Sequence, residues 1–244
     1  VRAGQEASWH MLMDEPKDIS VEITCLHTSE IHVPRFSVLF DAEGWDGRIV
    51  HVVRPDLLAR AQANGSETVR EDVSQILAAC EASNAMLCSC STLGPLIESF
   101  GADYVRVDRP VMEAAAQYKR VMLVICLEST RAATVNLFEA CVKAPDVRAH
   151  VIMCQTAWSF FEKGDMEGFY AAIAQDVLAG MDALADMDAL ADMDCVVLAQ
   201  ASMQGAAALL SDLGVPVMTT PVLAVRRAMQ TARRNCIQPA APSS

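Results

Sequence analysis

The sequence predicts an α/β fold made of parallel sheets, arranged as two similar lobes with a cleft between them. Two observations lead to this prediction. Short apolar runs alternate with longer helical patterns from Val21 onward, and one stretch of the chain repeats weakly further along. Apolar strands bracketed by helices are typical of parallel sheets that are covered on both faces and bind ligands beyond the carboxyl ends of their strands.

Eight segments are expected to be strands, because each is a short apolar run bounded by polar or turn-forming residues. They are 21–27, 48–54, 85–90, 104–107, 120–126, 148–154, 195–200 and 215–218. Helices are expected in the gaps between them.

The internal repeat aligns residues 87–107 with residues 197–217 without a gap. Both copies read as a strand, a tight polar turn, a helix and a second strand, and Pro110 and Pro221 then recur one residue out of step. Equivalent turns of two related lobes would face each other across a cleft. The repeat therefore predicts that Cys90 lies opposite Gln200.

These patterns divide the chain into an arm and two lobes. Residues 1–20 show no sustained period and are expected to form an N-terminal arm. Residues 21–108 together with 205–244 are expected to form lobe 1, and residues 109–204 lobe 2. The sequence MDALAD occurs at 181–186 and again at 187–192, which suits a lengthened acidic surface helix without a site.

Composition argues against several classes of partner. An apolar fraction of 52% with 20% charged residues is typical of a globular protein, and 19 basic against 31 acidic residues give a net charge of −12. This charge repels nucleic acid and anionic membrane surfaces, and no apolar run reaches the roughly 20 residues of a membrane span. Nine irregularly spaced cysteines without an export signal indicate free thiols and a cytoplasmic location.

The segment 88–94 (CSCSTLG) carries the clearest chemical signal, since a buried strand ends there in a polar turn before a helix. Cys90 would lie beside unpaired amides at the helix start, which are expected to lower its pKa from the reference of about 8.5. A thiolate among amides and the hydroxyls of Ser91 and Thr92 suits proton transfer at a carbon beside a bound carboxylate. The alternative is a small buried residue at a strand end.

Two motifs then resemble those of a known family. Cys90-Ser91-Thr92 resembles the Cys-Asn-Thr turn of aspartate and glutamate racemases, and residues 198–203 (LAQASM) resemble the Leu-Gly-Cys-Ala-Gly-Met turn of hydantoin racemases. The resemblance to this cysteine-based family covers roughly residues 21–230. It implies two flavodoxin-like lobes with the active site between them, a small carboxylate substrate such as an amino acid or a hydantoin, no pyridoxal phosphate, no metal, and a homodimer.

The sequence departs from that family at Gln200. In such racemases one cysteine removes the α-proton and a second returns it, and a glutamine cannot act as an acid or base near neutral pH. Cys195 does not replace the second thiol, because about 3.3 Å per residue puts it roughly 16 Å away at the far end of its strand. Three functions stay open: a racemase or isomerase that uses Cys90, a single-cysteine decarboxylase of the arylmalonate type, and a non-catalytic ligand-binding relative.

The expected substrate-binding residues lie in the turns that follow strands. They are Thr28, Ser29, Ser91, Thr92, Ser129, Thr130, Ala201 and Ser202. Turn closure and helix capping are the alternatives for the hydroxyl pairs at 28–29 and 129–130. His27 ends a strand and is expected to reach the cleft as a second acid or base. The chain shows no recognised zinc-binding spacing and no glycine-rich nucleotide loop.

Overall fold

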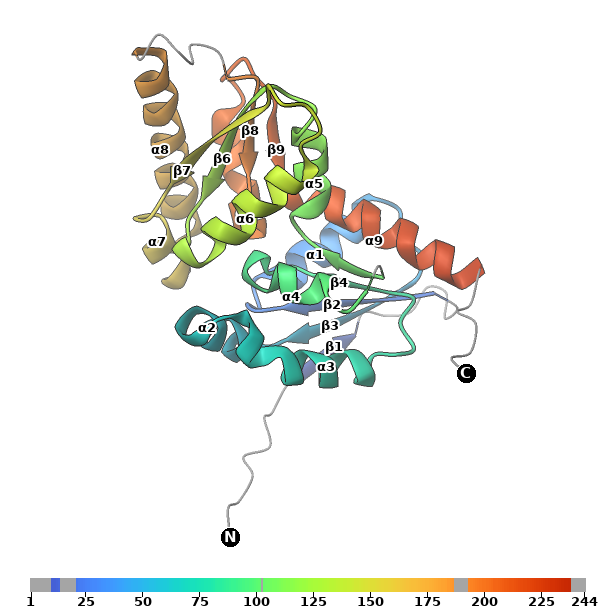
Figure 1. Cartoon of the computed structure of the whole chain (residues 1–244). Coiled ribbons are helices and arrows are strands. Elements are labelled where there is room, and N and C mark those ends of the chain that lie inside the picture. Colours follow the sequence, from blue (N-terminus) through green and yellow to red (C-terminus); the bar gives the residue numbers. More distant parts are fainter. Residues whose placement is uncertain (1–9, 14–20, 102, 187–192, 238–244) are drawn as a thin grey trace.

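The computed structural model describes residues 10–13, 21–101, 103–186 and 193–237, and it contains two sheets (Figure 1). The first sheet has the strand order β1-β3-β2-β4-β5, and the second has the order β7-β6-β8-β9. The strands of the first sheet are β1 (His10–Met13), β2 (Glu22–His27), β3 (Arg48–Val53), β4 (Ala85–Cys88) and β5 (Tyr104–Arg106). Those of the second are β6 (Arg120–Ile125), β7 (Arg148–Met153), β8 (Cys195–Leu198) and β9 (Val217–Thr219).

Helices fill the gaps between these strands. The α-helices are α1 (His32–Ala42), α2 (Pro55–Asn64), α3 (Arg70–Ala79), α4 (Gly94–Glu98), α5 (Arg109–Ala115), α6 (Glu128–Cys141), α7 (Trp158–Glu162), α8 (Met166–Asp186) and α9 (Thr220–Ile237). Three further segments are 3₁₀-helices, namely η1 (Ser66–Val69), η2 (Ser91–Leu93) and η3 (Ala201–Leu210). All eight expected strands are present, and the predicted α/β class is confirmed.

The two sheets repeat one another in order and register. Strands β3-β2-β4-β5 and β7-β6-β8-β9 follow the same sequence of parallel pairings. Glu22 opposes Arg48 at the start of β2 and β3, as Arg120 opposes Arg148 at the start of β6 and β7. In the first sheet, the second residue of β2 opposes the first of β4, and the second residue of β4 opposes the first of β5. The same offsets recur between β6 and β8 and between β8 and β9 in the second sheet. The predicted pair of pseudo-symmetric lobes is therefore confirmed.

Each sheet is covered by helices on both faces, as its apolar central strands require. On the first sheet, α1 and α9 contribute Phe36, Phe40 and Val225 to one core, and α2, α3 and α4 contribute to the opposite one. On the second sheet, α8 and η3 cover one face, and α5 and α6 cover the other. The helices hold the strand ends in fixed positions, and those ends carry the candidate site.

Two features at the chain's boundaries go beyond the sequence analysis. Residues 10–13 of the expected arm form β1, which pairs antiparallel with β3 at the edge of the first sheet. Strand β9 still belongs to the second sheet, and the chain returns to the first only with α9, whereas the sequence predicts the return at residue 205. In Figure 1, α9 is drawn in red and runs from the second lobe across the first.

Two expectations concern long helical segments. The first MDALAD copy ends α8, and the second copy lies outside the described residues. Within the described parts of the chain, no helix combines the length and the apolar character that crossing a membrane demands.

Candidate active site

The two turns related by the internal repeat have the same local structure. Cys90 follows β4 in an extended conformation, with φ −102° and ψ 112°, and precedes the 3₁₀-helix η2. Gln200 follows β8 with φ −121° and ψ 141° and precedes η3. Both turns lie at the carboxyl ends of central strands, where parallel sheets place their ligand sites.

A small cavity of about 30 Å³ joins these turns and is lined by both lobes. Its walls are formed by Thr28, His32, Leu58, Ser89, Cys90, Ser91, Thr92, Leu127, Thr130, Trp158, Gln200, Ala201 and Ser202. Sites for small molecules usually measure about 300–1,000 Å³, and this cavity has room for only one or two waters. The structure is therefore a closed form, and the lobes must separate before a carboxylate can enter.

Three sets of hydrogen bonds hold the lobes together around the cavity. Ser91 Oγ donates to the carbonyl of Ala199 at 3.3 Å. The hydroxyls of Thr92 and Ser129 lie 3.5 Å apart. Arg35 on α1 donates from Nη1 to the carbonyl of Ala201 and from Nη2 to the hydroxyl of Tyr170, both at 2.9 Å.

Cys90 is buried, and burial raises the pKa of its thiol. Hydrogen bonds from the hydroxyl of Thr28, from the backbone amides of Leu93 and Thr92, and from the hydroxyl of Thr92 oppose this shift. The expectation of a lowered pKa is therefore wrong, because removing the thiolate from water outweighs the donors around it. Cys90 rests as a neutral thiol, and the same donors would stabilise the thiolate left behind when its proton departs.

The side chain of Gln200 forms a hydrogen bond within the second lobe. Its side-chain Oε1 accepts a hydrogen bond from the backbone amide of Cys126, at the end of β6, with a distance of 2.5 Å. This bond links the β8 turn to the neighbouring strand. Cys195 begins β8 at the other end of the strand and does not line the cavity, and burial raises its pKa to about 12.

Eight of the ten residues predicted for the site line this cavity. Ser29 and Ser129 do not, although Ser129 contacts Thr92 from outside. The carbonyl of Ser29 accepts the amide of His32 at the start of α1, and the hydroxyl of Thr130 donates to the carbonyl of Leu127 at 2.7 Å. Turn closure thus accounts for the hydrogen bond of Ser29, and the hydroxyl of Thr130 bonds within the first turn of α6, which has no side-chain cap.

His27 does not reach the cavity as expected. It is fully buried behind Ser89, whose Oγ lies 2.8 Å from His27 Nδ1, while Nε2 lies 2.9 Å from Nδ1 of His51. Ser37 Oγ lies 3.1 Å from the other nitrogen of His51 and extends this chain toward α1. Burial lowers the pKa of His27 well below its usual value, so its ring is neutral near pH 7.

The same histidines form the group of potential metal ligands found among the described residues. Cys25, His27 and His51 place one ligand atom each within 4.8 Å of the others. Thiolate and imidazole ligands suit zinc. This group lies in the core of the first lobe under α1, behind the cavity wall.

Five lining residues were not predicted: His32, Leu58, Ser89, Leu127 and Trp158. His32 and Trp158 belong to helices α1 and α7 of different lobes. Their meeting depends on how the lobes close, which no local pattern in the sequence records. Ser89 could have been found, because it lies between Cys88 and Cys90 in the turn that carries the motif.

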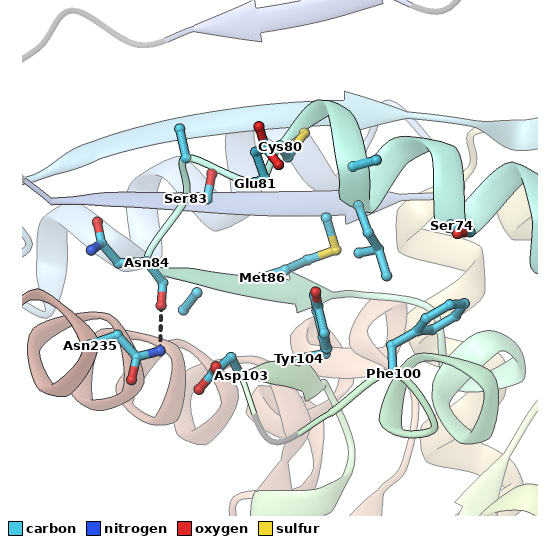
Figure 2. A pocket seen from close by; sticks show the side chains of 14 residues that line it. Ser74, Cys80, Glu81, Ser83, Asn84, Met86, Phe100, Asp103, Tyr104 and Asn235 are labelled. Atoms are coloured by element: carbon cyan, nitrogen blue, oxygen red, sulfur yellow. Dashed lines mark hydrogen bonds between the residues drawn. The ribbon is translucent and has the colours of Figure 1, made fainter. Parts of the chain in front are cut away.

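A larger cavity, of about 650 Å³, lies at the opposite end of the first sheet (Figure 2). It borders Ala85 and Met86 at the start of β4 and includes Asn235, whose Nδ2 donates to the carbonyl of Asn84 at 2.9 Å. Its charged lining residues are Glu81 and Asp103, and none of its described walls is cationic. This negative charge disfavours a carboxylate ligand, so the cavity at Cys90 remains the candidate active site.

Comparisons with known proteins bear on the fold. No family model and no curated protein matches the chain. Glutamate racemase RacE1 from Bacillus anthracis is 14% identical, with 88% of this chain and 82% of that one aligned at a TM-score of 0.65. Picrophilus torridus aspartate racemase is 12% identical, and the alignment covers 87% of this chain and 94% of that one at a TM-score of 0.63. A glycine-to-cysteine mutant of arylmalonate decarboxylase is 14% identical, and the alignment covers 91% of this chain and 97% of that one at a TM-score of 0.57. The chain has the two-lobed fold of these enzymes.

Proposed function

We propose that this protein is a cofactor-independent racemase or isomerase of a small carboxylate, such as an amino acid or a hydantoin, in which Cys90 transfers the proton. The observation that carries this proposal is the position of Cys90, in an interlobe cavity and among hydrogen-bond donors to its sulfur. The fold shared with racemases that are named for glutamate and aspartate supports it.

Anion binding in this site relies on neutral donors. Four residues with hydroxyl groups line the cavity, namely Thr28, Ser91, Thr92 and Ser202. No lysine or arginine lines it among the described residues, although Arg35 lies just outside. Amides at the starts of 3₁₀-helices can hold a carboxylate and stabilise the charge that develops when the adjacent carbon loses its proton.

Cys90 acts first as an acid in this scheme, because burial keeps it protonated. The S–H bond breaks, its proton passes to the carbanion that is left after a base on the opposite face has taken the α-proton, and the electron pair stays on sulfur. Thr28, Thr92 and the amide of Leu93 then stabilise the thiolate. In the reverse direction the thiolate removes the same proton.

A single-cysteine decarboxylase is the second candidate. Burial holds Cys90 as a neutral thiol, and Leu58, Leu127 and Trp158 make part of the cavity wall apolar. An apolar wall favours loss of a carboxylate as carbon dioxide, after which one thiol is sufficient to protonate the carbanion. A non-catalytic ligand-binding protein is the third candidate, and it would bind ligand equally well without the thiol.

The test is a panel of enantiopure amino acids, hydantoins and substituted malonates, followed by chiral chromatography. We expect the wild type to convert at least one compound and Cys90→Ser to lose the conversion by about 10²-fold or more, the usual range for a general acid. Cys236→Ser is the matched control, because Cys236 is exposed at the end of α9. Equal rates for Cys90→Ser and wild type would reject the proposal.

Products separate the candidates. Interconversion of enantiomers identifies a racemase, and a monoacid formed from a malonate identifies a decarboxylase. Binding without any turnover, unchanged in Cys90→Ser, identifies the non-catalytic protein. The homodimer and the cytoplasmic location implied at the start remain predictions, and sedimentation velocity tests the first of them.

A further inference from the structure

Replacement of the second cysteine by Gln200 leaves one side of the substrate without an acid or base. Inversion at a carbon requires proton transfer on two opposite faces, and an amide side chain cannot supply it. Among the described residues that line the cavity, only Cys90 and His32 carry side chains of the kind that serve as acid or base near neutral pH. His32 is therefore the group to consider for the second transfer.

His32 begins α1 and faces both lobes. Its ring lies edge-on to Phe36 of the same helix, with centroids 6.2 Å apart, and stacks on Phe161 of α7 at 6.4 Å. The side chain is only 7% exposed. The ring of His27 lies 6.1 Å away as well, so the imidazole is held in the cavity wall among three neighbouring rings.

One nitrogen of this ring lacks a hydrogen-bond partner in the described part of the chain. Nδ1 of His32 is buried and forms no hydrogen bond with any described residue. Buried polar atoms are nearly always paired, and an exception calls for an explanation, such as a role in catalysis or a missing ligand. A ring kept only for packing would be better served by phenylalanine, which has no nitrogen to desolvate.

The electrostatic setting keeps the ring uncharged. Burial, followed by the positive charge of Arg35 three residues on, lowers the pKa of His32 to about 3. The imidazole is neutral near pH 7 and carries a lone pair on one nitrogen. A neutral imidazole and a neutral thiol therefore line the same small cavity.

We propose that His32 is the second proton-transfer group of this site and acts in place of the thiol that Gln200 lacks. This inference rests on the proposed racemase or isomerase function and names the residue that completes it. In this assignment, Cys90 transfers the proton on one face of the substrate carbon and His32 transfers it on the other.

The step balances without any other reactant. The α C–H bond breaks, its proton passes to a nitrogen of His32, and its electron pair stays on carbon, delocalised toward the carboxylate. The S–H bond of Cys90 breaks and its proton joins the carbon from the other face. An imidazolium and a thiolate remain as a pair of opposite charges, whose attraction offsets the burial that opposes each charge alone. This pair processes the opposite enantiomer in the reverse direction, which restores the neutral pair.

The decisive experiment follows solvent deuterium into each enantiomer of aspartate and glutamate, together with any panel compound that turns over. We expect His32→Asn to lower exchange from one enantiomer by about 10²-fold or more relative to exchange from the other, and Cys90→Ser to show the opposite preference. His32→Gln is a second variant of the same kind, and His150→Asn on β7 is the matched control. Exchange at the wild-type rate from both enantiomers in His32→Asn would overturn the proposal.

A second readout does not depend on turnover. In ¹⁵N NMR spectra of the full-length wild-type protein, the imidazole signals that disappear in His32→Asn are assigned to His32, and D- and L-glutamate are then titrated in. We expect those signals to shift on binding while the signals of His150 do not. Failure of all substrates to react would count against the proposed function alone, whereas bound glutamate without a shift at His32 would overturn the role of His32.

Discussion

Burial and hydrogen bonding act in opposite directions on the thiol of Cys90. Its four donors were partly foreseen in the sequence, since Thr92 lies two residues after Cys90 in the same turn and Thr28 directly follows the neighbouring strand. The depth of burial was not foreseen: Cys90 packs in a core of the first lobe with Cys88 and Leu93, beside a cavity that both lobes line. A local motif can predict which hydrogen-bond donors surround a thiol, but it cannot predict how far tertiary packing excludes water from that thiol.

The raised pKa predicts slow alkylation of Cys90. In the full-length protein at pH 7.5, iodoacetamide should modify Cys90 at least about tenfold more slowly than the exposed Cys236, because only the thiolate reacts. The Cys90 rate should rise steeply as the pH passes above the usual thiol range. Peptide mass spectrometry with time gives both rates, and faster modification of Cys90 than of Cys236 at neutral pH would show a lowered pKa instead.

At the scale of elements, the turns and the helices that carry them were the most predictable part of the site. The aligned segments 87–107 and 197–217 correctly placed Cys90 and Gln200 in equivalent turns. The sequence missed the contribution of α1, which follows β2 and brings His32 to the cavity and Arg35 to the other lobe. Helix α1 lies outside the repeat that was detected, so nothing local marked its amino-terminal turns as functional.

Arg35 is expected to stabilise the closed form. Hydrogen bonds to a charged donor contribute about 1.5–3 kcal/mol each, and Arg35 makes two across the lobes. Arg35→Met should therefore raise KM about tenfold or more with a smaller change in kcat, since about 1.4 kcal/mol corresponds to a factor of ten. The radius of gyration from small-angle scattering should increase as well.

Tyr170→Phe should have a smaller effect than Arg35→Met, because it removes only one of the two hydrogen-bond acceptors of Arg35 and keeps the aromatic ring. Its KM should lie between those of wild type and Arg35→Met. An Arg35→Met protein with unchanged KM and unchanged radius of gyration would show that these bonds do not govern closure.

At the scale of the whole molecule, two buried neutral histidines make stability depend on pH. Burial lowers the pKa of both His27 and His32, and for His32 the value is about 3. The unfolded chain binds these protons near pH 6.5, whereas the folded protein resists them. The stability that they contribute is therefore present above pH 6.5 and is lost as the pH falls below it.

Urea unfolding between pH 7 and pH 5 measures this effect. Each imidazole should contribute up to about 1.4 kcal/mol of lost stability per pH unit below 6.5, so His32→Asn should have a visibly shallower slope than wild type. His150→Asn provides the comparison outside the site. Identical slopes in wild type and His32→Asn would mean that His32 takes up its proton in the folded protein.

The two-lobed fold could be predicted from the sequence only in part. Short apolar strands and the weak repeat were sufficient for the two lobes, because parallel strands covered on both faces need continuous apolar runs. The pairing of His10–Met13 with β3, and the late return of the chain at α9, depend on contacts between distant segments. Neither leaves a periodic signal in the sequence.

Wash-in of solvent deuterium at the carbon beside the carboxylate, measured by mass spectrometry in D₂O, tests whether Cys90 transfers a proton. It detects proton transfer whether the product is an inverted enantiomer or a decarboxylated acid. We predict deuterium in at least one small carboxylate with the wild type and with Cys236→Ser, and with Cys90→Ser a reduction by about 10²-fold or more for the substrate or enantiomer that exchanges through Cys90. Wash-in at the wild-type rate from every substrate and from both enantiomers in Cys90→Ser would contradict the assignment of proton transfer to Cys90.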